Sequence, residues 1–216
     1  MTDVLGHSRY LVVGGDWGAS IAVRLAHAYP DAVAGLHLYM MPLRRLETWP
    51  ESEAASRAEL SRWLREEGGY IAIQGTRPQT LAFGLTDSPA GLAAWIVEKF
   101  RAWSDCGGEP ERAISRDEML ANISLYWFTG AIGSSFWPYY ARMHGPWPIP
   151  EGQTVDVPTG YVEFPKEILR PPRSLAARTY TDIRRWSVMP KGGHFAALEQ
   201  PEALAREIIE FFRPLR

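Results

Sequence analysis

An aspartate between closely spaced glycines is the side chain of this 216-residue sequence best placed to do chemistry. It is Asp16, in the run Gly14-Gly15-Asp16-Trp17-Gly18, which follows the apolar segment 10–13. The apolar pattern changes there from that of a strand to that of a helix, which predicts a strand, a tight turn and a helix. The Gly-x-Asp-x-Gly spacing is typical of a nucleophile elbow with aspartate in place of serine. We expect the strained turn to need glycine on both sides and to expose Asp16 at the carboxyl end of the sheet.

Two other interpretations of this turn are open at this point. A dinucleotide fingerprint fits poorly, because the spacing is not G-x-G-x-x-G and Trp17 would block approach of a pyrophosphate. An ordinary strand–helix turn with Asp16 as helix N-cap is the simpler alternative. A nucleophile requires a base and an orienting acid further along the chain, so their presence decides between the interpretations.

A histidine with the setting of a catalytic base stands near the C-terminus. His194 follows Lys191-Gly192-Gly193 and comes after a predicted strand over 183–189, and Pro201 opens an amphipathic last helix. This places the nucleophile before the histidine in the chain, as in α/β-hydrolases. The remaining histidines lack such a setting and are interpreted as structural: His7, His27, His37 and His144.

Several motifs taken together resemble the epoxide hydrolases of the microsomal and juvenile hormone type, in the α/β-hydrolase superfamily. They are Gly14-Gly15-Asp16-Trp17-Gly18, Tyr126-Trp127, Pro158-Thr159-Gly160 and Gly192-Gly193-His194-Phe195-Ala196-Ala197. The resemblance extends over essentially the whole chain. It implies an α/β fold with a mostly parallel sheet, a nucleophile elbow and an inserted α-helical lid, in enzymes of detoxification and aromatic hydrocarbon catabolism.

The resemblance also implies a role for each site residue. Asp16 matches the nucleophile, His194 the general base, and Glu167 the acid that orients the histidine. Tyr70 and Tyr139 match the two lid tyrosines that hold the epoxide oxygen, although Tyr140 leaves open which neighbouring ring points inward. The backbone N–H of Trp17, just after the nucleophile, is expected to belong to the oxyanion hole.

The expected reaction converts a small hydrophobic epoxide and water to a vicinal diol, without metal or organic cofactor. Asp16 would attack a ring carbon to give an alkyl-enzyme ester, which water activated by His194 would hydrolyse. A haloalkane dehalogenase shares the aspartate and histidine but binds halide through tryptophan N–H groups, and it is the alternative enzyme. An inactive, truncated hydrolase that serves at most as a binding module is the alternative from another class.

The pattern of expected strands and helices divides the chain into three segments. Residues 1–42 and 148–216 alternate strand and helix patterns and are expected to form the hydrolase core, with one helix near 174–180. Residues 43–147 are expected to form the α-helical lid, since helical periodicity dominates and seven of the nine tryptophans lie there. Within the lid we expect one helix over 51–69 with a glycine stop at its end, a helix opened by Ser88-Pro89, and a capping box at Ser115 and Glu118.

Composition describes a globular protein without a polyelectrolyte partner. Apolar residues make up 46% of the sequence and the formal net charge is −2, which argues against nucleic acid as a partner. A single cysteine excludes a disulfide framework and favours a reducing, cytoplasmic location. No apolar run is long enough to span a membrane, and a homo-oligomer is compatible with the sequence.

The sequence departs from the family pattern at its beginning. Only residues 1–9 precede the elbow strand, and no His-Gly-x-Pro turn, which contributes to the family's oxyanion hole, occurs in the chain. We therefore expect that the N-terminal strands of the fold are missing. On its own, the 216-residue chain is expected to aggregate and to be inactive.

Overall fold

A computed structural model describes residues 1–43, 49–146 and 149–215 of the chain. The chain divides into two compact units, one made of residues 1–49 with 147–216 and the other of residues 50–146. The first predicted boundary, between residues 42 and 43, lies a few residues before this division. The second, at residues 147 and 148, lies outside the described residues.

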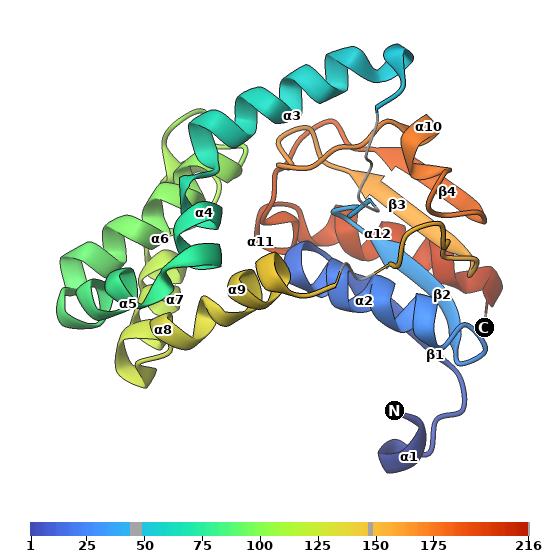
Figure 1. Ribbon diagram of the computed structural model, residues 1–216, viewed down its shortest axis with the longest axis horizontal. Coiled ribbons are helices and arrows are strands. Elements are labelled where there is room, and N and C mark those ends of the chain that lie inside the picture. Colours follow the sequence, from blue (N-terminus) through green and yellow to red (C-terminus); the bar gives the residue numbers. More distant parts are fainter. Residues whose placement is uncertain (44–48, 147–148, 216) are drawn as a thin grey trace. The chain divides into compact units, whose positions relative to one another are not determined.

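The first unit is an α/β structure around a parallel sheet, as predicted (Figure 1). Its four described strands lie in the order β1-β2-β3-β4, and each adjacent pair is parallel. In chain order its elements are α1 (Thr2–Leu5), β1 (Tyr10–Gly14), α2 (Asp16–Ala28), β2 (Val33–Leu38), β3 (Thr159–Glu163), α10 (Arg173–Ala176), β4 (Ile183–Val188), α11 (Ala196–Glu199), α12 (Pro201–Phe212) and the 3₁₀ helix η3 (Arg213–Leu215). Parallel strands bring their carboxyl ends to one edge, where the elbow and the His194 loop must meet.

Helices α2 and α12 cover opposite faces of this sheet. Leu36 and Leu38 on β2 point to the face that carries the buried alanines of α2. Because side chains alternate along a strand, His37 points to the other face, where its ring lies 5.6 Å from that of Phe211 on α12. A Cβ on Gly160 would lie 2.7 Å from the Phe211 ring, so the absence of a side chain at that position lets α12 approach the sheet closely.

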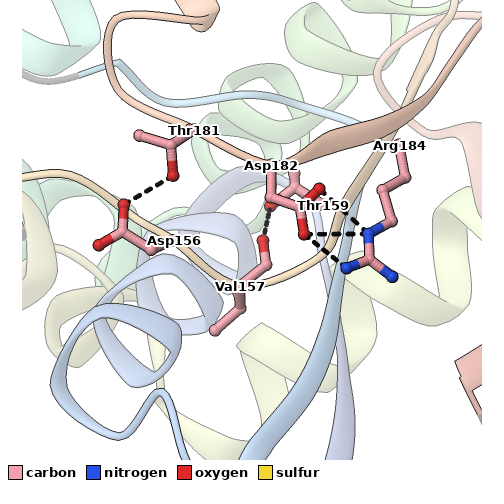
Figure 2. A network of polar contacts seen from close by, with 6 residues as sticks. All are labelled: Asp156, Val157, Thr159, Thr181, Asp182 and Arg184. Carbon is pink, nitrogen blue, oxygen red and sulfur yellow. Dashed lines mark hydrogen bonds and ion pairs between the residues drawn. The ribbon is translucent and has the colours of Figure 1, made fainter.

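A network of polar contacts holds the segments that lead into β3 and β4 (Figure 2). Thr181 donates a hydrogen bond to Asp156 at 2.7 Å, and Arg184 pairs with Asp182 at 2.7 Å. The backbone N–H of Thr159 donates to the carbonyl of Asp182 at 2.8 Å. Hydrogen bonds from Thr181 and Thr154 lower the pKa of Asp156 below its usual value. This network thus links the segments at which the two strands begin.

Residues 50–146 contain helices and no strand. Their elements are η1 (Glu51–Glu53), α3 (Ala54–Glu67), α4 (Gly69–Thr76), α5 (Pro78–Asp87), α6 (Pro89–Trp103), η2 (Pro110–Arg112), α7 (Arg116–Thr129), α8 (Ile132–Ser135) and α9 (Trp137–His144). Both predicted helix starts are confirmed: Ser88 accepts a hydrogen bond from the Gly91 N–H at 3.0 Å, and Ser115 and Glu118 form the capping box. A core of residues from α5 to α8 includes Leu92, Ile123 and Phe136.

Two predicted helices are wrong in extent. The first was expected over 51–69 with a glycine stop, but Gly68 has right-handed helical φ and ψ and the chain continues directly into α4. A Cβ on Gly68 would lie 2.3 Å from the carbonyl oxygen of Leu64, so glycine allows a sharp change of direction between helices there. The second, expected near 174–180, extends only over Arg173–Ala176, and the chain beyond it pairs with Val155, whose N–H donates a hydrogen bond to the Thr179 carbonyl at 2.8 Å.

Candidate active site

The turn between β1 and α2 places Asp16 in a strained backbone conformation. Its φ of 46° is the only positive value of a non-glycine residue in the described part of the chain. A Cβ on Gly14 would lie 2.5 Å from the carbonyl oxygen of Gly18, and one on Gly15 would overlap the Tyr39 ring. A non-glycine residue with positive φ persists only when its surroundings enforce it, and such residues concentrate at functional sites.

The expectation that glycine is required on both sides of Asp16 is only partly right. A Cβ on Gly18 would meet no atom within 4 Å among the described residues. The close approach occurs at Gly14, because the backbone of the first helical turn comes over that residue.

The loops after β3 and β4 carry the acid and the histidine, and their backbones are joined. The N–H of Lys166 donates to the carbonyl of Gly192 at 3.0 Å, and Lys166 and Gly193 form a parallel bridge. Gly192 has a φ of 108°, and a Cβ at this position would lie 2.7 Å from the Phe164 ring. This glycine therefore allows the turn into His194 to pack against the end of β3.

Asp16, His194 and Glu167 come together from three different loops. The Nδ1 atom of His194 lies 2.7 Å from Oε1 of Glu167, and Nε2 lies 3.7 Å from Oδ2 of Asp16. The same Glu167 oxygen accepts a hydrogen bond from the Ile168 N–H at 2.6 Å, which fixes the carboxylate. With Nδ1–H donating to Glu167, the other ring nitrogen is left facing Asp16.

The solvent exposure of the side chain differs sharply among Glu167, His194 and Asp16, which lie in a row in that order. The Glu167 side chain is 0% exposed and that of His194 is 6% exposed, whereas that of Asp16 is 50% exposed. A buried carboxylate beside a buried imidazole orients it, and an accessible carboxylate at the end of the row can meet a reactant. The arrangement is that of a nucleophile, a base and an orienting acid.

The two carboxylates favour the protonated form of the histidine. Burial alone lowers the pKa of His194, but its interactions with Asp16 and Glu167 act in the opposite direction and raise it to about 10. The imidazolium is therefore the ground-state form while both carboxylates are charged. Any step that removes the charge of Asp16 would weaken this effect and ease the loss of the proton.

Two further residues lie at this edge of the sheet. Trp17 is the second residue of α2, so its backbone N–H is in the first turn, where amide groups point toward the N-terminal end of a helix. Tyr39 directly follows β2, and its ring packs over Gly15. Burial, together with the negative charges of Glu167 and Asp16, raises the pKa of Tyr39. Sequence reasoning missed Tyr39, although its place after a buried strand beside β1 could have indicated it.

The predicted tyrosine donors lie in the unit of residues 50–146. Tyr70 on α4 and Tyr139 on α9 form an edge-to-face pair with ring centres 5.7 Å apart. The Tyr70 side chain is buried, with 7% of its surface exposed. Tyr140 is 43% exposed and stacks on His144 at 4.1 Å. The ring that packs against Tyr70 is therefore that of Tyr139. The acid–base group and the tyrosine pair belong to different units.

In the ranges 1–43, 49–146 and 149–215, no cluster of three or more histidine, cysteine, aspartate or glutamate side chains could bind a metal ion. None of the helices described in those ranges is both long and apolar enough to cross a membrane.

No protein-family model matches the chain, but the chain is similar to several known proteins. The chain is 42% identical to a protein of Stigmatella aurantiaca, over 98% of its own length and 48% of the relative's. It is 37% identical to epoxide hydrolase 1 of Oryctolagus cuniculus, over 96% of its length and 51% of the relative's. The crystal structure of juvenile hormone epoxide hydrolase from Bombyx mori matches with a TM-score of 0.86 and 30% identity, over 100% of this chain and 57% of that one. The chain thus spans about half the length of the curated relatives it matches.

Proposed function

We propose that this chain, a homologue of the epoxide hydrolases of the microsomal and juvenile hormone types, carries the reacting groups of an enzyme that converts an epoxide and water to a vicinal diol. The observation that supports this most strongly is the row formed by Asp16, His194 and Glu167 at the ends of the strands. The Asp16 carboxylate is half exposed on a strained turn, as a nucleophile must be, and the histidine behind it is oriented by a buried acid.

The residue at the elbow determines which chemistry is feasible. A serine that opened an epoxide would form an ether, which water does not readily cleave. An aspartate forms an ester, and water can hydrolyse an ester through a tetrahedral intermediate. Aspartate at this position therefore suits substrates that are attacked at an sp³ carbon, such as epoxides.

In the first step, an oxygen of Asp16 attacks a carbon of the oxirane while the ring C–O bond breaks. The leaving oxygen is an alkoxide and needs a proton donor. Tyr70 and Tyr139 are proposed as donors because their rings are packed together in one unit and they are the residues that the family resemblance indicates. Two phenols are neutral, directional donors and suit a small hydrophobic substrate.

In the second step, His194 takes a proton from the water that attacks the carbonyl carbon of the ester. Formation of the ester removes the negative charge of Asp16, which is one of the causes that raise the pKa of His194. The imidazolium consequently gives up its proton more readily once the ester has formed, and the neutral ring becomes a base. The N–H of Trp17 is proposed to stabilise the oxyanion of the tetrahedral intermediate.

Tyrosine-to-phenylalanine variants test the proposed substrate class. In the full-length protein that carries this sequence, Tyr70→Phe and Tyr139→Phe should each slow the opening of an aromatic epoxide by about 10²-fold, and the double variant more, because the alkoxide loses its proton donor. Tyr140→Phe is the matched control and should change the rate less than about threefold. Ring opening and ester hydrolysis are measured separately by rapid-quench kinetics.

Either of two outcomes would favour a haloalkane dehalogenase instead. Undiminished epoxide opening in the double variant, or faster turnover of 1-haloalkanes than of epoxides, would reject the assignment of the phenols. The control with Tyr140→Phe distinguishes loss of a donor from general damage to α9.

A further inference from the structure

A lysine ammonium group lies among three aromatic rings in the unit of residues 50–146. The Nζ atom of Lys99, on α6, is 4.8 Å from the ring centre of Tyr70, 5.3 Å from that of Trp103 and 5.9 Å from that of Trp95. Only 14% of the Lys99 side chain is exposed. We call Lys99 and these three rings the Lys99 cluster. A cation held over aromatic faces away from bulk water is attracted by their negative π surfaces.

The Lys99 cluster includes one of the two phenols proposed to hold the epoxide oxygen. Tyr70 is 7% exposed, and it contacts Trp103 at 5.1 Å and Tyr139 at 5.7 Å between ring centres. Helix α6, which carries Lys99, thus delivers a positive charge to the ring of a residue on α4. In the described ranges, the acidic partner of Lys99 is Glu98, and the Glu98 side chain is 58% exposed. Because the Glu98 carboxylate is more exposed, solvent screens its electrostatic effect on the Tyr70 ring more than it screens that of the Lys99 ammonium group.

The attraction between a cation and a phenol depends on the state of the phenol. In a neutral phenol, the cation interacts only with the ring quadrupole. In a phenolate, the negative charge spreads from the oxygen into the ring, and the interaction becomes one between opposite charges. A cation over the ring therefore stabilises the phenolate more than the phenol, and this difference is what can contribute to catalysis.

We propose that Lys99 is a positioning residue for epoxide opening, whose ammonium group holds the Tyr70 ring and stabilises the negative charge that develops on it during proton transfer. This inference rests on the proposed function. In the step itself, the oxirane C–O bond breaks and its electron pair stays on oxygen, while an Asp16 oxygen bonds to the carbon. The proton moves from the Tyr70 hydroxyl to the released oxygen, leaving a phenolate. Hydrolysis of the ester later releases one proton, which restores the phenol.

A purely structural role for Lys99 would have different consequences. The ammonium group also joins α6 to α4 through Tyr70, so its loss could simply loosen the packing of the two helices. Lys99→Met retains an apolar stem of similar length without the charge, and Lys99→Arg retains the charge. Glu98→Gln leaves Lys99 in place and removes its counter-ion. An electrostatic role predicts that Lys99→Met and Glu98→Gln shift the ionisation of Tyr70 in opposite directions. A structural role predicts no such opposite shifts.

The first measurement does not depend on activity. Alkaline ultraviolet difference spectra follow the ionisation of the phenols, and the component that disappears in Tyr70→Phe identifies Tyr70. We expect Tyr70 to ionise about one pH unit higher in Lys99→Met than in the parent, at lower pH in Glu98→Gln than in the parent, and near the parent value in Lys99→Arg. An unchanged Tyr70 ionisation in Lys99→Met and Glu98→Gln would overturn the proposal. If Lys99→Met does not fold, Glu98→Gln and Lys99→Arg still decide it.

The second measurement uses single-turnover kinetics of the full-length protein with an aromatic epoxide. Lys99→Met should slow ring opening about 10-fold and leave ester hydrolysis unchanged, and Lys99→Arg should restore most of the loss. Equal slowing of both steps would show a structural role and would contradict the proposal. If the parent opens no epoxide, the proposed function fails, and the spectroscopic result alone then decides whether Lys99 controls the ionisation of Tyr70.

Discussion

Replacement of His37 by leucine is expected to remove part of the acid sensitivity of the fold. His37 is fully buried on β2, and neither ring nitrogen has a hydrogen-bond partner among the described residues. Burial lowers its pKa from 6.5 to about 4; the charge of Glu207 acts against this shift, and that of Arg185 adds to it. The unfolded chain therefore binds a proton at His37 near pH 6.5, whereas the folded chain resists protonation down to about pH 4.

The expected magnitude follows from this difference. Above pH 6.5 the imidazole is neutral in both states, so its full contribution to stability is present, and it is lost as the pH falls toward 4. Between pH 7 and pH 4.5 the loss amounts to about 2.5 kcal/mol, given ~1.36 kcal/mol per pKa unit. His37→Leu has no such group and should be more stable than the parent at pH 7 by about 1–3 kcal/mol, because two unsatisfied nitrogens are removed from the core.

Urea unfolding of the full-length protein that carries this sequence, at pH 7 and at pH 4.5, measures both effects. The loss of unfolding free energy between the two pH values should be about 2.5 kcal/mol smaller in His37→Leu than in the parent. Titrating groups that do not interact with His37 contribute equally in both proteins and cancel in this difference. Equal losses in the parent and the variant would refute the inference that His37 is held neutral by burial.

Two further predictions concern the elbow and the sheet edge. In urea unfolding of the full-length protein, Gly14→Ala should destabilise the fold by about 1–3 kcal/mol, because its Cβ would lie 2.5 Å from the Gly18 carbonyl oxygen. Gly18→Ala has room for its Cβ and should change stability by less than ~1 kcal/mol. Equal effects of the two variants would place the close approach elsewhere. Strand β1 lies at the edge of the sheet of described strands, and its side chains Leu11 and Val13 are 38% and 40% exposed. We therefore expect the 216-residue chain to self-associate in sedimentation experiments, and the Leu11→Lys, Val13→Lys double variant to self-associate much less. A monomeric parent would contradict this expectation.

The parts of the fold that sequence reasoning anticipated depend on local rules. Ser88 and Ser115 cap helices through contacts within three residues, so their spacing alone identifies them. The strand–turn–helix around Asp16 was predictable because glycines must accompany a backbone that closes so tightly. His194 could be placed for the same reason, since its glycines precede it directly.

The parts that were missed depend on contacts between distant segments. Whether Tyr139 or Tyr140 packs inward is decided by the approach of Tyr70 from another helix, and neighbouring residues on one helix give no sign of it. Gly68 signals a helix end by type, yet its effect here is to let α4 begin beside the Leu64 carbonyl. Trp95 and Trp103 lie four residues before and after Lys99 on α6, so helical spacing alone places these two rings beside it. The contact with Tyr70 of α4, in contrast, depends on packing between two helices and is not visible in the sequence.

The most direct test of the proposed nucleophile is detection of its covalent intermediate. In the full-length protein, His194→Gln removes the base for ester hydrolysis while leaving Asp16 able to attack, so an aromatic epoxide such as styrene oxide should accumulate as an alkyl-enzyme. Intact-protein mass spectrometry should show one added substrate mass, peptide mapping should locate it on Asp16, and Asp16→Ala should abolish both the adduct and diol formation. Diol formation that persists in Asp16→Ala, or an adduct on any other residue, would contradict the mechanism proposed for this site.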